Sequence, residues 1–169
     1  MWAAQRRYDL MVVFTFSPLA QLAQQVSWYR AEHPTGRVAV FVPLVVDDDH
    51  ATAVARGRQY LARYHAVWAS AAKAWNTRVS TDFDPAYRAF ASMLSMASYD
   101  TMNTIGSVFF GCPSYVVDKL EWLREGLNPS HVLFNLDIGA MPFEYSSRTL
   151  EALVTNVLPR VASGAKAAV

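Results

Sequence analysis

Three continuous apolar runs, each followed by a stretch with helical periodicity, set the pattern of this chain. The runs cover residues 10–16, 38–46 and 131–137. They are rich in β-branched and aromatic residues and do not alternate with polar ones, which is typical of strands buried on both faces. The pattern therefore predicts an α/β fold in which these strands lie parallel in one sheet with helices outside.

The spacing of apolar residues between the runs predicts the helices. The expected helices cover residues 18–33, 50–75, 85–99, 113–126 and 146–158. Pro18 and Pro113 stand at helix starts, where proline is favoured, and Gly126 stands at a helix end. Residues 1–7 read as the last turns of a helix, and residues 105–110 as a short strand or an extended approach to Gly111.

The length of the chain bounds its architecture. It has 169 residues, 53% of them hydrophobic, and shows no linker, so we expect a single domain over residues 1–162 and a frayed tail at 163–169. A complete (β/α)8 barrel needs about 250 residues and eight strands. The pattern therefore predicts a partial (β/α)8 TIM barrel, made of its last three to four βα units.

Charge and cysteine content exclude several partners. The net charge is +1 without a basic cluster, so no nucleic-acid partner is expected. No apolar run approaches the roughly 20 residues of a membrane helix. The one cysteine fits a reducing cytoplasm. Arg6 and Arg7 before an apolar run resemble a twin-arginine export signal, but Asp9 lies inside that run and Pro18 ends it, which favours a buried strand.

Few residues suggest chemistry by themselves. Residues 47–49 are three aspartates before His50, which could bind a metal, but capping of the next helix explains them better, and we predict no metal site. His33, His65 and His131 are scattered, so we expect surface or core positions for them. Cys112 precedes a helix start, which can lower a thiol pKa, yet a plain turn residue is the favoured interpretation.

Several short segments together resemble a known family. They are Trp2-Ala3-Ala4-Gln5-Arg6-Arg7, Gly111-Cys112-Pro113-Ser114, Val117 to Gly126, the strand from His131 to Asp137, Ile138-Gly139-Ala140-Met141-Pro142, and Val157-Leu158-Pro159-Arg160. In this order they resemble the C-terminal portion of bacterial-luciferase-like, flavin-dependent monooxygenases. The resemblance extends from residue 1 to about residue 162 and rests on the succession of units, since no single catalytic signature is present.

The resemblance implies an oxidoreductase that uses reduced FMN and O2 on a small organic substrate, with a deazaflavin as the other possible cofactor. Phe14 or Phe16 would lie beside the flavin ring, and the loop from Gly139 to Pro142, with Met141, would wall the same pocket. No catalytic residue is assigned. The family's serine-rich phosphate loop and its usual histidine would precede Trp2, so we expect a truncated form that binds flavin weakly by itself.

Two function classes stay open at this stage. One is a luciferase-like monooxygenase or a subunit of one, served by a flavin reductase. The other is a non-catalytic remnant or interaction module that keeps the C-terminal part of the fold. In either case a partial barrel leaves open sheet edges. We therefore expect self-association, or a partner chain carrying the N-terminal half.

Overall fold

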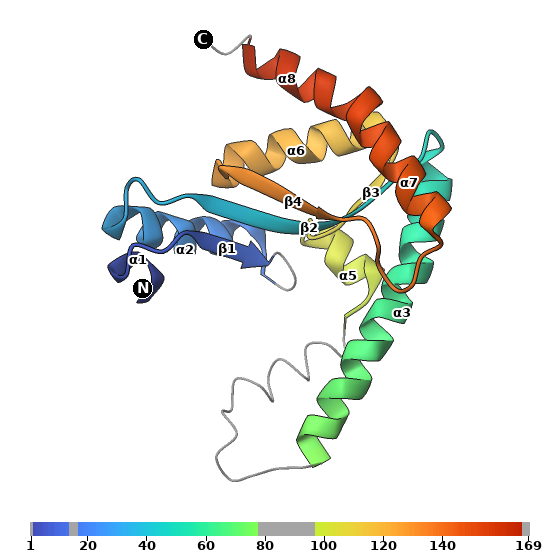
Figure 1. The fold of residues 1–169 in the computed structure, drawn as a ribbon, viewed down its shortest axis with the longest axis horizontal. Helices are drawn as coiled ribbons and strands as arrows, with labels where there is room; N and C mark the ends of the chain where they lie inside the picture. The colour runs from blue at the N-terminus through green and yellow to red at the C-terminus, as the bar shows by residue number, and fades with distance from the viewer. Residues whose placement is uncertain (1, 14–16, 78–96, 167–169) are drawn as a thin grey trace.

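The structure, a computed structural model, describes residues 2–13, 17–77 and 97–166 (Figure 1). Its elements are α1 (Trp2–Gln5), β1 (Leu10–Val13), α2 (Leu19–Glu32), β2 (Val38–Val46), α3 (His50–Thr77), α5 (Tyr99–Thr104), β3 (Phe109–Gly111), α6 (Pro113–Leu127), β4 (His131–Asn135), α7 (Phe143–Ala152), the π-helical turn η1 (Leu153–Val157) and α8 (Leu158–Lys166).

The strand β2 organises the sheet, because each of the other three strands pairs with it in parallel. β1 pairs with the first half of β2, with Leu10 opposite Val38. β4 pairs over residues 39–43 of β2, and the short β3 pairs over residues 44–46. The expectation that residues 10–16, 38–46 and 131–137 lie parallel in one sheet is thus confirmed for their described parts.

The strand order differs from a simple succession of βα units. In such a succession β4 would pair with β3, the strand before it in the chain, whereas here it pairs with β2. The cause is the shortness of β3, which has three residues and occupies only the carboxyl end of β2. The amino-terminal half of β2 is thereby left to β4.

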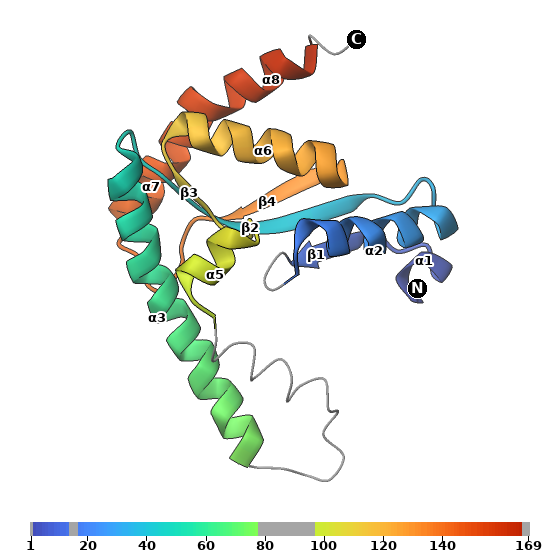
Figure 2. The ribbon, with the colours of Figure 1, turned by 180° about the vertical axis from the view of Figure 1, so that it is seen from behind.

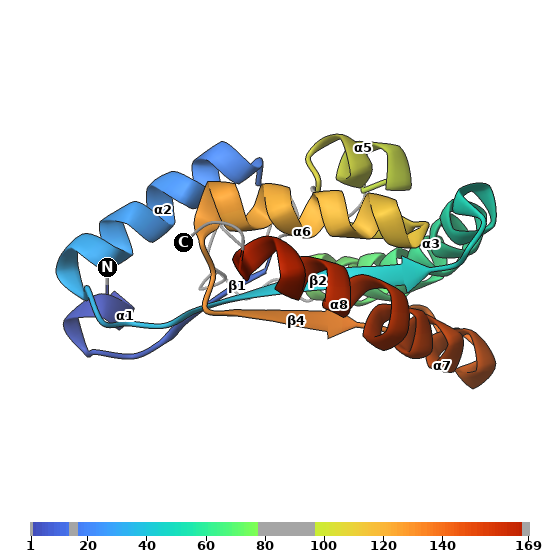
Figure 3. The same ribbon diagram turned by 90° about the horizontal axis from the view of Figure 1, so that it is seen from above.

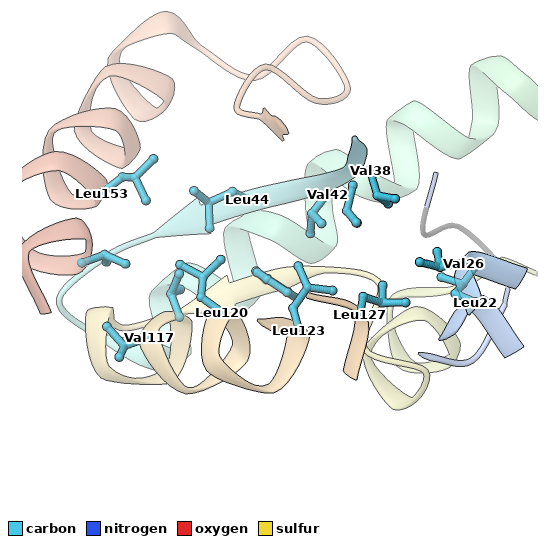
Figure 4. Close-up of a cluster of buried hydrophobic side chains, with 14 of the residues drawn as sticks. Leu22, Val26, Val38, Val42, Leu44, Val117, Leu120, Leu123, Leu127 and Leu153 are labelled. Atoms are coloured by element: carbon cyan, nitrogen blue, oxygen red, sulfur yellow. The ribbon is translucent and has the colours of Figure 1, made fainter. Parts of the chain in front are cut away.

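Alternate residues of β2 belong to two different cores. Its even-numbered residues lie in the larger core with α2, α6 and η1 (Figure 4). The residues of that core labelled in Figure 4 are Leu22, Val26, Val38, Val42, Leu44, Val117, Leu120, Leu123, Leu127 and Leu153. Val45 faces the other way and packs with Tyr60 and Leu61 of α3 in a second core.

The helices are therefore divided between the two faces of the sheet. α2 and α6 lie on the same side of the strands (Figures 2 and 3). α3 meets the opposite face at the carboxyl end of β2 and then runs away from the sheet (Figure 1). Helices cover the outside of a (β/α)8 barrel, so we take the face under α2 and α6 as the outer face and call the opposite face, which α3 meets at one end, the inner face.

An apolar row crosses the inner face. The pairing registers place Val13, Phe41 and Leu133 side by side on β1, β2 and β4. The outer two members remain open, with 51% of Val13 and 44% of Leu133 exposed. The described part of the sheet thus presents apolar side chains that nothing in the described chain covers fully.

Some element boundaries differ from the sequence expectations. The strand expected to end at residue 16 is described only as far as Val13, and the helix expected at 85–99 lies mostly outside the described residues. The last helix begins at Phe143, contains a π-helical turn and continues to Lys166, into the segment expected to be frayed.

Candidate active site at the carboxyl ends of the strands

The carboxyl ends of β2, β3 and β4 lie at one end of the sheet because the strands are parallel. This is the end at which (β/α)8 enzymes place their reactive groups. The β2 end continues into Asp49, whose carboxylate caps α3 by accepting the Thr52 N–H at 2.8 Å and the Thr52 hydroxyl at 2.6 Å. These bonds hold the pKa of Asp49 below its usual value. The expected capping role is confirmed for this aspartate.

Asp47 has a different role from Asp49. Its carboxylate binds Arg56 Nη1 at 2.8 Å in a largely buried pair, with 13% of the arginine side chain and 24% of the aspartate exposed. The Arg56 guanidinium also lies 4.0 Å from the centre of the Tyr145 ring. A cation above an aromatic face is attracted to it. This arrangement links the β2 end, α3 and α7 into one rigid wall.

Two hydroxyl groups of α7 attach that helix to the strand ends. Thr149 Oγ1 accepts the main-chain N–H of Val46 at 3.3 Å, at the end of β2. Ser146 Oγ donates to the carbonyl of Leu136 at 2.9 Å, just after β4. Both residues are buried, so these bonds satisfy main-chain groups at strand ends that water reaches poorly.

A polar hollow lies beside this wall. Its volume is about 330 Å³. Its charged lining residues are Asp47, Asp48, Arg148 and Glu151. Thr155 and Asn156 of η1 line it too, and both also border a wider hollow of about 580 Å³ that reaches Cys112 and Arg160. π-helical turns occur frequently at functional sites, which makes this surface a candidate for binding polar groups.

Cys112 stands at the N-terminal end of α6, as the sequence predicted. Its sulfur lies 3.2 Å from Ser114 Oγ. That hydrogen bond, followed by one from the Tyr115 main-chain N–H, lowers the pKa of the Cys112 thiol. The lowered pKa makes the thiolate easier to form, but none of the described residues that line the hollow beside Cys112 is a histidine. The chemical role of Cys112 stays a prediction, with the turn residue still favoured.

The predicted flavin-side residues have different surroundings. Phe14 and Phe16 lie outside the described residues. Met141 is 5% exposed and belongs to the second core with Tyr60. Gly139 has a φ of +59° and lies so close to α3 that a Cβ would be 1.9 Å from the Tyr60 carbonyl oxygen. The structure places both residues of this loop against α3, and their role toward a flavin stays a prediction.

The histidines separate into core and surface. His65 is 6% exposed and His33 8%, whereas His131 is exposed at the start of β4. Burial lowers the pKa of His65, which makes its neutral form the stable one. The sequence left its position open, although four-residue spacing from the buried Leu61 would have indicated the core. Within the described chain, no group of three or more His, Cys, Asp or Glu is placed to hold a metal ion.

A flavin fits the described residues in part. The row of Val13, Phe41 and Leu133 offers an apolar floor on which a ring system could lie. The polar hollow carries three carboxylates beside Arg148, and carboxylates repel a phosphate. The described part of the chain thus suits the ring of such a cofactor better than its phosphate.

The comparisons with known proteins rest on fold. No protein-family model matches the chain, and no curated protein matches it in sequence. The monooxygenase RslO1 from Streptomyces bottropensis matches with a TM-score of 0.69 and 23% identity, over 94% of this chain and 44% of that chain. The FMN complex of the oxygenating constituent of 3,6-diketocamphane monooxygenase from Pseudomonas putida matches with a TM-score of 0.60 and 18% identity, over 95% and 45%.

A third solved structure extends the range of cofactors. The coenzyme F420-dependent tetrahydromethanopterin reductase from Methanopyrus kandleri matches with a TM-score of 0.56 and 15% identity, over 94% of this chain and 47% of that chain. At such identities the likeness shows a shared fold. The chain spans less than half the length of these three solved structures. In the described residues, no helix is both long enough and apolar enough to cross a membrane.

Proposed function

We propose that this chain is part of a luciferase-like, flavin-dependent monooxygenase that oxidises a small organic substrate with O2. The observation that supports this best is the fold: a parallel sheet with its carboxyl ends gathered at one site, similar over 94–95% of the chain to two monooxygenases. The same likeness gives no support to a purely non-catalytic module, which stays the alternative outcome of the test below.

FMN is the cofactor we favour, with a deazaflavin as the alternative. One of the similar structures holds FMN and another is F420-dependent. When bound, a reduced flavin would supply the electrons that activate O2. In this proposal the apolar row of the inner face, including Phe41, carries the ring, and the loop at Gly139 borders it. The phosphate would be held by residues beyond those matched here.

The proposal also requires another chain or segment. Val13 and Leu133 leave the inner face open, and β1 has a neighbour on one side only within the described sheet. Self-association, or a partner that supplies the opening half of a (β/α)8 barrel, would cover this face. A flavin reductase would supply reduced flavin, and the single cysteine of the chain suits the reducing cytoplasm.

Flavin retention tests the proposal. The purified 169-residue chain is mixed with FMN, passed through a desalting column and examined for flavin absorbance, alone and with a second chain that supplies the opening half of the barrel. We expect little FMN on the chain alone, and retention with substrate oxidation in the pair, because catalysis needs a fixed cofactor. Retention in neither sample would favour the non-catalytic module. Micromolar affinity and turnover by the chain alone would contradict the need for a partner.

Two kinds of variant locate the cofactor in the reconstituted pair. Phe14→Ala or Phe16→Ala should weaken FMN retention, because an aromatic ring contributes stacking contact beside a flavin. Cys112→Ser is the control, since it replaces the thiol with a small hydroxyl at a helix N-cap. If Cys112→Ser lost as much FMN as the Phe14 or Phe16 variant, the flavin would have to lie near Cys112, at the start of α6.

A further inference from the structure

A small cavity lies between the inner face of the sheet and α3, apart from the polar hollow described above. Its volume is about 40 Å³. One water-sized group needs about 10–15 Å³ of such volume, so the cavity has room for about three. All three long strands contribute to its wall, together with α3 and α5.

The walls of the cavity are mainly apolar. Phe41 from β2, Leu61 from α3 and Met102 from α5 all line it. Leu61 and Met102 are 1% and 2% exposed, so this side of the cavity is closed to solvent. Apolar walls of this kind favour an apolar occupant over water.

Three polar side chains interrupt the apolar walls, namely Tyr64, His65 and Asn135. None of the described lining residues is Asp, Glu, Lys or Arg. His65 is neutral in its ordinary state because burial lowers its pKa. His65 already has a hydrogen bond with the main chain of Ala97. Asn135 is half-buried at the cavity wall, and a polar side chain in apolar surroundings costs free energy unless it is hydrogen-bonded, so its amide favours an occupant with a hydrogen-bonding atom.

We propose that this cavity binds an uncharged group of three or four heavy atoms that carries one hydrogen-bonding atom, held by Asn135 against the walls of Phe41 and Met102. A charged group of the same size would lose its hydration without gaining a counter-ion. The cavity shares Val13 and Phe41 with the apolar row proposed for the flavin ring, so the test below uses the chain without flavin, and its result is separate from that of the flavin-retention experiment.

Three probes of equal size test this inference on the unmodified chain. Acetone, acetate and isopropylammonium each have four heavy atoms and carry zero, negative and positive charge. Each is titrated while the methionine methyl groups are followed by NMR, with Met102 in the cavity wall and Met11, which is 58% exposed, as an internal reference. We expect acetone to shift the Met102 methyl saturably and to leave Met11 almost unchanged, and the two ions to give no saturable shift.

Variants then assign the polar contact. Asn135→Leu should weaken acetone binding at least threefold, whereas Asn156→Leu, which removes an exposed asparagine from the polar hollow, should leave it unchanged. An equal response of Met102 to acetate or isopropylammonium, or a shift with acetone that never saturates, would overturn the proposal. Because the three probes are compared on the unmodified chain, that result stands even if the Asn135 variant fails to fold.

Discussion

The peptide at Gly139 shows how tightly single residues are constrained at the carboxyl end of β4. Gly139 and Ala140 both have positive φ angles, +59° and +56°. Glycine adopts this conformation freely, whereas an alanine there costs about 1–2 kcal/mol. Gly139 has the additional restriction of the nearby Tyr60 carbonyl.

Exchanging the two residue types tests this constraint. Gly139→Ala should lower the free energy of unfolding by about 2–4 kcal/mol, from the positive φ and from the contact with Tyr60. Ala140→Gly is the matched control and should leave stability unchanged or raise it by up to about 1 kcal/mol. Urea denaturation of the three proteins measures both values. Similar stabilities for Gly139→Ala and the unmodified chain would mean that α3 does not approach this loop.

At the residue scale the sequence predicted the roles of residues that act on their neighbours in sequence better than the roles that depend on distant residues. The cap at Asp49 follows from its place before a helix, and the structure confirms it. The ion pair of Asp47 with Arg56 was not predicted, although the two residues are only nine positions apart. The position of Arg56 also depends on the Tyr145 ring, which comes from a distant part of the chain. Capping rules predict contacts between residues close in sequence, whereas most contacts at this end of the sheet join residues that are far apart in sequence.

At the scale of elements, the π-helical turn explains how the last helix stays on the core. The residues of this helix that face the core follow a strict spacing of four: Thr149, Leu153, Val157 and Val161. In an α-helix such positions drift by about 40° at each step, because 3.6 residues complete a turn. A turn with wider spacing corrects the drift, so α7 keeps Thr149 on the end of β2 while η1 and α8 lie against α6.

Two valines within that turn provide a matched test. Val157 is fully buried, whereas 53% of Val154 is exposed. Val157→Ala should cost about 1–2 kcal/mol of stability through lost burial and a small cavity, and Val154→Ala should stay within about 0.5 kcal/mol of the unmodified chain. Thermal unfolding of both variants measures the difference. A larger effect of Val154→Ala would show that this face is covered in solution.

The continuous apolar runs predicted where the strands begin, and they did so because burial on both faces leaves a strong composition signal. The π-helical turn was missed, since the expectation assumed helical spacing of 3.6 throughout. The pairing of β4 with β2 was also beyond the sequence, because a residue such as Phe134 fits equally well beside either neighbour.

At the scale of the whole molecule, the open inner face predicts association. Met11, Val13 and Trp28 are each more than half exposed, and they border a groove along the edge of β1. Exposed strand edges in proteins commonly carry a charge or a proline, and the four residues of β1 carry neither. An edge of this composition is suited to contact with another strand.

Sedimentation velocity at micromolar concentration should therefore show a species larger than the 18.9 kDa monomer, alone or with a partner chain. Val13→Lys should weaken the association, because it places a charge in the apolar contact. Gln24→Lys adds the same charge at an exposed position of α2 and serves as the control. A compact, stable monomer of the unmodified chain would contradict the prediction.

The pairing of β4 with β2 also affects how the chain is made. The main-chain N–H of Val38 in β2 donates to the hydroxyl of Ser130, the residue just before β4, across 92 positions of sequence. At the usual 5–20 residues per second, synthesis of that interval takes roughly 5–20 s. The unit of β1, α2 and β2 leaves the ribosome before β4, and during those seconds β2 has no β4 beside it. The strand that organises the finished sheet is thus also a strand whose pairing is completed only after most of the described chain has been synthesised.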